Sequence, residues 1–239
     1  MSAVASITPT VKLHLNKRQV TFLIPLYITL MVAAVSVLIS LIAWRSGSQP
    51  GSDGWVTGSR NNPGIAYSLP GFLVYLGVQS IATTFPFALT LGATRRAFTA
   101  GTLTWAAMVS AYLALMVAAL TLLELATNHW FVGFYMFDIY ILGTGNIPLL
   151  LAIVFLGTLT SLTIGGVFGA AWVRFGSNGP RTLGIALGLI IAVTALLIVP
   201  AWPDLVDGFQ LWWLAAVAVG VIAASSIASW ALLRSATVR

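Results

Sequence analysis

Six long apolar runs constrain the fold of this chain more than any motif in it. They occupy residues 20–43, 70–91, 102–125, 148–173, 183–201 and 211–233. Each is close to the ~20 residues with which an α-helix crosses the ~30 Å hydrocarbon core of a bilayer. Backbone groups in lipid must satisfy their hydrogen bonds internally, and the alternation typical of outer-membrane strands does not occur in this sequence. The sequence therefore predicts an all-α integral membrane protein with six transmembrane helices.

The proportion of charged residues supports the same conclusion. Charged residues make up 7% of the 239 residues and hydrophobic residues 59%, whereas an ordinary soluble domain is about 25% charged. A multi-pass protein of the cell membrane is expected. Abundant Ala and Gly, with Arg outnumbering Lys, indicate a GC-rich bacterial source.

The basic residues fall almost entirely on one side of the predicted bundle. If the N-terminus is cytoplasmic, only Arg45 and Arg60 lie outside, and nine lie inside: Lys12, Lys17, Arg18, Arg95, Arg96, Arg174, Arg181, Arg234 and Arg239. Because Lys and Arg are enriched in cytoplasmic loops, both termini are expected in the cytoplasm. The net charge of +6 then reflects contact with anionic membrane lipid, and no nucleic-acid partner is expected.

This orientation divides the chain into a cytoplasmic tail at 1–19, a transmembrane domain at 20–233 and a second tail at 234–239. The first tail interleaves charged and apolar residues around Lys12. It fits either an interfacial helix with its basic side toward headgroups or a solvated tail. The outer loop at 44–69 is rich in Gly, Ser, Asn and Pro and predicts a flexible linker.

The second outer segment, 126–147, is unusually aromatic. Trp130, Phe134, Phe137 and Ile141 recur at helical spacing, which predicts an interfacial or shallow re-entrant helix, since such aromatics favour the membrane interface. The segment is either an aromatic anchor or an outer gate that meets cargo. Glu124 is either a carboxylate at headgroup level or an ion relay. The candidates for this outer interface or gate are Glu124, Trp130, Phe134, Phe137 and Asp138.

Two pairs of glycines at four-residue spacing predict close helix packing. They are Gly165 with Gly169 and Gly184 with Gly188. Small residues at this spacing let helices approach closely in lipid, either within the chain or at the seam of a homodimer.

The sequence gives no sign of catalysis by this chain. His14 and His129 lie in the tail and an outer loop, so no nucleophile–base pair is expected in the membrane. Cysteine does not occur, and neither does the glycine-rich phosphate loop of nucleotide hydrolases. We therefore expect no catalytic, cofactor-binding or metal-binding residues, and energy for any transport must come from a partner.

One short basic stretch lies between the second and third apolar runs, on the expected cytoplasmic side. It reads Leu91-Gly92-Ala93-Thr94-Arg95-Arg96-Ala97-Phe98-Thr99-Ala100-Gly101-Thr102. This stretch resembles the first cytoplasmic loop of permease subunits in type-2 ATP-binding-cassette (ABC) exporters, where a Leu-Gly-x-[Ser/Thr]-Arg-[Arg/Lys]-x-[Phe/Tyr]-x-x-Gly pattern is common. The six spans, the cytoplasmic termini and the short inner loops are similar too. The short segment before the last span, about 202–210, departs from the family.

The resemblance implies that this chain binds a separate cytosolic ATPase subunit through a coupling helix at about 92–101. The coupling residues would be Gly92, Thr94, Arg95, Arg96 and Phe98. The two arginines would orient the helix, and Phe98 would fill a cleft on the ATPase. ATP would bind the partner subunit, and a second permease copy or a paralogue would complete the unit.

Two other functions remain open. A stand-alone channel or carrier needs no ATPase, although the lack of a charged residue in the middle of any apolar run argues against an ion-coupled carrier. An accessory membrane scaffold would pack beside another complex. If the charges are considered alone, Arg95 and Arg96 fit a simple positive-inside anchor.

Overall fold

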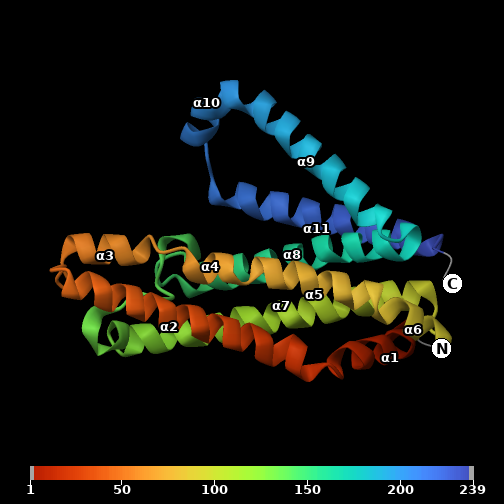
Figure 1. The fold of residues 1–239 in the computed structure, drawn as a ribbon, viewed down its shortest axis with the longest axis horizontal. Coiled ribbons are helices and arrows are strands. Elements are labelled where there is room, and N and C mark those ends of the chain that lie inside the picture. Colours follow the sequence, from red (N-terminus) through yellow and green to blue (C-terminus); the bar gives the residue numbers. More distant parts are fainter. Residues whose placement is uncertain (1–2, 237–239) are drawn as a thin grey trace. The chain divides into compact units, whose positions relative to one another are not determined.

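The computed structural model describes residues 3–236, which form helices joined by turns and, between α7 and α8, by a longer segment that is mostly not helical (Figure 1). Within these residues, six segments are long and apolar enough to cross a membrane: Gln19–Arg45, Asp53–Thr90, Arg95–Ala126, Ile147–Phe175, Asn178–Ala201 and Leu211–Arg234. No β-strand occurs in this described range. The prediction of an all-α chain with six candidate membrane-spanning helices is therefore confirmed for the described residues. Residues 1–2 and 237–239, which belong to the two expected tails, lie outside the described residues.

The elements follow one another in a simple order. They are α1 (Ala3–Leu15), η1 (Gln19–Leu23), α2 (Ile24–Arg45), α3 (Asp53–Arg60), α4 (Gly64–Ser68), α5 (Pro70–Ala82), α6 (Thr84–Thr90), α7 (Arg95–Ala126), η2 (His129–Gly133), η3 (Tyr140–Leu142), α8 (Ile147–Phe175), α9 (Asn178–Ile198), η4 (Val199–Ala201), α10 (Trp202–Asp207) and α11 (Leu211–Arg234). Pro25 lies in the first turn of α2, directly after the π-helical turn η1.

The prediction of a flexible linker at 44–69 is wrong, because this segment contains α3 and α4. The hydroxyl of Ser52 accepts a hydrogen bond of 3.3 Å from the N–H of Trp55 and caps α3. The side chain of Asn62 accepts one of 2.9 Å from the N–H of Gly64 at the start of α4. The Ser, Asn and Gly residues that resembled a linker serve as caps and turns between two short helices.

The chain divides into two compact units. Unit 1 contains the described residues of Met1–His14, Val74–Thr104 and Leu162–Arg239, and unit 2 contains Leu15–Leu73 and Trp105–Ser161. The boundaries between the units fall within α1, α5, α7 and α8.

The core of unit 1 gathers apolar residues from the ends of several helices. Its buried members are Ile81, Phe85, Ala88, Phe98, Ala170, Leu233 and Ala236. Phe98, in the first turn of α7, is a member of this core, so Arg95 and Arg96 at the start of α7 lie beside the core.

The core of unit 2 is built around the aromatic segment that follows α7. Its buried members are Ala33, Trp55, Ile65, Val117, Ala118, Phe134, Met136, Phe137, Ile139, Leu142 and Leu150. Five of them come from 134–142, so this segment is a packed part of unit 2.

Helix α9 has a different environment from the other long helices. From Arg181 to Pro200 every residue is exposed except the half-buried Leu183. Its side chains are mostly Leu, Ile, Val and Ala, so this helix presents apolar surface along its length, which suits contact with lipid.

Candidate functional site

Two groups of residues carry the functional expectations, one in each unit. We call residues 91–98 in unit 1 the coupling turn. We call Glu124, Asp138, Arg60 and His129 in unit 2 the carboxylate cluster.

The coupling turn is shorter than the helix expected at 92–101. Helix α6 ends at Thr90, and α7 already begins at Arg95. Gly92 has φ of +84°, and its N–H donates a 3.0 Å hydrogen bond to the carbonyl of Leu89. The hydroxyl of Thr94 accepts a 3.2 Å hydrogen bond from the N–H of Ala97. A left-handed glycine ends one helix and a threonine cap starts the next, so a tight turn replaces a separate coupling helix.

Arg95 and Phe98 point into unit 1. The Arg95 guanidinium donates a 2.5 Å hydrogen bond to the carbonyl oxygen of Leu233 and lies 6.0 Å from the centre of the Phe85 ring. Phe98 is 0% exposed and packs edge-on against Phe85, with ring centres 5.1 Å apart. A side chain with no exposed surface cannot fill a cleft on a partner, so the role expected for Phe98 is wrong. Its apolar ring is used in the core of its own chain.

Four other residues of the coupling turn are exposed, whereas Ala97 is buried and Ala93 is half-buried. Leu91 is 66% exposed, and Gly92, Thr94 and Arg96 are exposed too. The two neighbouring arginines therefore differ, since Arg95 ties the turn to α11 and Arg96 is free to meet a headgroup or another protein.

Helix α1 packs against the beginning of α7. Nε2 of His14 and the hydroxyl of Thr102 are hydrogen-bonded at 3.0 Å, and the His14 ring lies 5.9 Å from that of Phe98. A Cβ atom on Gly101 would lie 2.7 Å from Cβ of Thr10, so the two helices touch at this glycine. The segment 3–15 is therefore a packed helix and not a solvated tail.

Glu124 is the centre of the carboxylate cluster. Its side chain is 0% exposed and accepts hydrogen bonds from three successive backbone N–H groups: Met136 at 3.1 Å, Phe137 at 2.8 Å and Asp138 at 3.2 Å. Nε1 of Trp130 donates a fourth at 3.3 Å. Glu124 is therefore enclosed by donors of its own chain and is not an exposed carboxylate. These neutral donors compensate for the loss of water around a buried carboxylate and hold the segment 130–138 in place.

Asp138 links the same segment to α3. Its side chain is 1% exposed, and Oδ2 lies 2.7 Å from Nη2 of Arg60 and 3.0 Å from Nε2 of His129. The Arg60 guanidinium also lies 5.0 Å from the centre of the Tyr135 ring. A second link joins the two segments, because Nε1 of Trp55 donates a 2.6 Å hydrogen bond to the carbonyl of Gly133.

The helix expected across 126–147 does not form. Asn128, His129, Trp130 and Phe131 all have positive φ, between 50° and 65°, a conformation that L-residues adopt only at a cost. Three backbone N–H groups bind the Glu124 carboxylate, so they cannot bond to carbonyls of a preceding helical turn. The only turns with helical hydrogen bonds between 126 and 147 are η2 and η3.

The gate candidates therefore lie mostly inside unit 2. Phe134 and Phe137 are buried and Trp130 is half-buried, whereas their neighbour Phe131 is 85% exposed. The sequence prediction did not identify Arg60, His129 and Trp55 as partners of this segment. The available sequence signal for Arg60 was its position on the expected outer side, where basic residues are rare.

The two glycine pairs differ in their surroundings. A Cβ on Gly165 would collide with the carbonyl oxygen of Val74, and one on Gly169 would lie 2.6 Å from that of Val78. Helices α5 and α8 are thus in backbone contact here. A Cβ on Gly188 would have no described atom within 4 Å, and one on Gly184 would have only Phe168, at 3.9 Å. The prediction that Gly184 and Gly188 mark a close contact between helices of the same chain is therefore wrong.

Comparison of the chain with protein-family models, with curated proteins and with solved structures found no match.

Proposed function

We propose that this chain is the membrane-spanning permease subunit of an ATP-driven ABC exporter. A separate cytosolic ATPase subunit binds it at the coupling turn. The observation that carries the proposal is a turn whose sequence matches the family pattern and whose outward residues, Leu91, Thr94 and Arg96, are exposed. A second copy of the chain or a paralogue completes the transport unit in the cell membrane.

The inward residues of the coupling turn support the same function. If movement of an ATPase subunit is transmitted through this turn, the turn must be bonded to or packed against the helices that move, because rigid elements transmit such motions. Arg95 binds the carbonyl of Leu233 near the end of α11, and Phe98 packs in the core of unit 1. The positive-inside bias of the sequence favours the cytoplasmic side for this turn, and ATP is available on that side.

The test is purification of the tagged chain from its native membrane. A nucleotide-hydrolysing subunit is expected to co-purify with the unaltered chain. Arg96→Glu is expected to lose most of that subunit, because a charge reversal at an exposed contact repels a partner that the arginine attracted. Arg18→Glu is the matched control, since Arg18 is exposed on the same expected side.

Two results would contradict the proposal. One is that no nucleotide-hydrolysing subunit accompanies the unaltered chain. The other is that Arg96→Glu and Arg18→Glu retain the subunit equally. Cargo or ion flux in vesicles that contain this chain alone would favour a stand-alone channel or carrier instead.

A further inference from the structure

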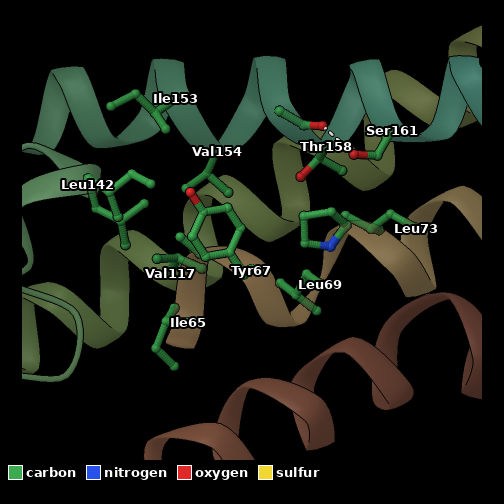
Figure 2. A pocket seen from close by; sticks show the side chains of 14 residues that line it. Ile65, Tyr67, Leu69, Leu73, Val117, Leu142, Ile153, Val154, Thr158 and Ser161 are labelled. Carbon is green, nitrogen blue, oxygen red and sulfur yellow. Dashed lines mark hydrogen bonds between the residues drawn. The ribbon is translucent and has the colours of Figure 1, made fainter. Parts of the chain in front are cut away.

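Unit 2 contains a pocket that none of the sites above uses. Its volume is about 260 Å³, and it is lined by residues of α4, α5, α7 and α8 together with Leu142 and its neighbour Ile141. Figure 2 shows Val154 and Thr158 of α8 on one side of the pocket and Leu69 and Leu73 on the other. The pocket lies wholly within unit 2.

The lining of the pocket is almost entirely apolar. Most of its side chains belong to Leu, Ile, Val, Ala and Pro. The hydroxyl of Ser161 donates a 2.8 Å hydrogen bond to the carbonyl of Gly157, drawn as a dashed line in Figure 2, so this polar group is already satisfied. Water needs two to four polar partners in a cavity, and an apolar cavity of about 150 Å³ stays dry and takes up a ring as large as benzene. This larger pocket suits an apolar guest.

The depth of the pocket identifies the kind of guest available. The lining residues of α8 run from Ile153 to Ser161, and α8 begins at Ile147. At 1.5 Å per residue they lie about 9 to 21 Å from the start of that helix. This interval falls within a helix long enough to span the membrane, at a level where the surroundings are hydrocarbon and not headgroups or water.

The pocket also has an open side. Tyr67 lines it and is 69% exposed, so the pocket meets the surface of unit 2 there. A guest with a hydrocarbon chain could enter the pocket at this side, and its chain could lie along α8. The hydroxyl of Tyr67 would then remain near the polar end of the guest.

We propose that this pocket binds a single hydrocarbon chain, either the acyl chain of a membrane phospholipid or that of a single-chain amphiphile. An empty apolar pocket forfeits the dispersion contacts that its lining would make with a guest. The site requires only that the chain spans a membrane. It does not depend on the ATPase partner, so a failed co-purification leaves it standing.

Gly157 offers a way to fill the pocket without disturbing the fold. It lines the pocket, and a Cβ atom built on it has no described atom within 4 Å. Because Gly157 lies on the wall of the pocket, Gly157→Leu is expected to extend a side chain into the space of the guest. Gly220→Leu is the matched control, because Gly220 also has free space around its Cβ, lies on α11 and does not line the pocket.

The experiment uses the full chain in vesicles that contain a phospholipid with a photoreactive group in the middle of one acyl chain. A parallel sample contains a photoreactive fatty acid. After illumination, adducts are mapped by mass spectrometry on peptides from 65–73 and 153–161, and adducts on lipid-exposed α9 serve as the internal reference. We expect the pocket-to-α9 adduct ratio to fall about tenfold in Gly157→Leu, since displacing two methylenes from an apolar site weakens binding by that factor.

Val154→Phe, a second filling variant, is expected to lower the ratio as well, and Gly220→Leu is expected to leave it unchanged. Adducts from the phospholipid identify a membrane lipid as the guest, and adducts from the fatty acid alone identify a single-chain amphiphile. Pocket peptides without adducts from either probe would overturn the inference. So would a ratio that neither filling variant changes.

Discussion

Arg95 and Leu233 are 138 residues apart in sequence and are joined by a 2.5 Å hydrogen bond from guanidinium to carbonyl oxygen. Arg96, the next residue, is exposed to the surroundings. Two neighbouring arginines thus lie in different environments, since Arg95 is hydrogen-bonded within unit 1 and Arg96 is exposed on its surface.

The first prediction separates these two tasks. Arg95→Ala removes a charged donor from the carbonyl of Leu233 and is expected to lower the free energy of unfolding by about 1–2 kcal/mol. Arg96→Ala removes an exposed side chain, and its effect is expected to stay within about 0.5 kcal/mol. Thermal unfolding of the purified variants in detergent measures both values, and equal losses would contradict the assignment.

A second prediction concerns the carboxylate of Glu124. Glu124→Ala leaves three buried backbone N–H groups without an acceptor and is expected to cost on the order of 4 kcal/mol. Glu124→Gln keeps one acceptor oxygen but brings an NH₂ group toward the donors, so its cost is expected to be about half as large. Amide hydrogen exchange at 136–138 is expected to speed up in both variants. Asp53→Ala, which alters an exposed carboxylate of unit 2, is the control.

A third prediction tests the ion pair between Arg60 and Asp138. A double-mutant cycle of Arg60→Gln and Asp138→Asn is expected to give a coupling free energy of about 1–2 kcal/mol, because Asp138 is buried while Arg60 is 27% exposed. The same cycle with Arg45→Gln in place of Arg60→Gln is expected to give a value near zero, since Arg45 is exposed. Unfolding in detergent measures the four variants of each cycle.

A fourth prediction compares two glycines within long helices. Gly165→Ala forces a Cβ into the carbonyl of Val74 and is expected to cost about 2 kcal/mol or more, as overpacking does. Gly188→Ala meets no described atom within 4 Å and is expected to be neutral or stabilising by up to about 1 kcal/mol. A stable Gly165→Ala protein would show that α5 and α8 are not in backbone contact.

A fifth prediction concerns the orientation of the chain in the membrane. The sequence has no cysteine, so an introduced cysteine is the only thiol that a reagent can label. Ser48→Cys and Thr94→Cys place single thiols at exposed positions on opposite expected sides. A membrane-impermeant maleimide is expected to label Ser48→Cys in intact cells and Thr94→Cys only after permeabilisation. The reverse pattern would refute the cytoplasmic placement of the coupling turn.

The spanning helices were predictable because length and apolar content are local properties of the sequence. Five of the six predicted runs nearly match structural segments. The run expected at 70–91 covers the second half of Asp53–Thr90 and ends one residue beyond it. The boundary at α7 was less accurate. Gly92 and Thr94 already carried the signals for ending one helix and starting another, but the apolar run itself began only at 102.

The arrangement of 126–147 was not predictable, for two physical reasons. The spacing of Trp130, Phe134 and Phe137 suits a helix, but it also results when a non-helical segment turns these rings toward one core. In addition, a carboxylate that binds backbone N–H groups leaves no pattern in the sequence, because every residue except proline supplies the same donor. The sequence signal for left-handed backbone in this segment was the presence of Asn128, Gly133, Gly143 and Gly145, because Asn and Gly adopt positive φ most readily.

The glycine contacts between α5 and α8 have a mechanical consequence. With the backbones touching at Gly77, Gly165 and Gly169, these portions of the two helices have no side chains between them to compress or reorient. These portions of α5 and α8 are expected to move together as one rigid body. A hinge in either helix would therefore lie outside the contacts at these glycines. The junction at Thr83, between the end of α5 and the start of α6, lies outside these contacts.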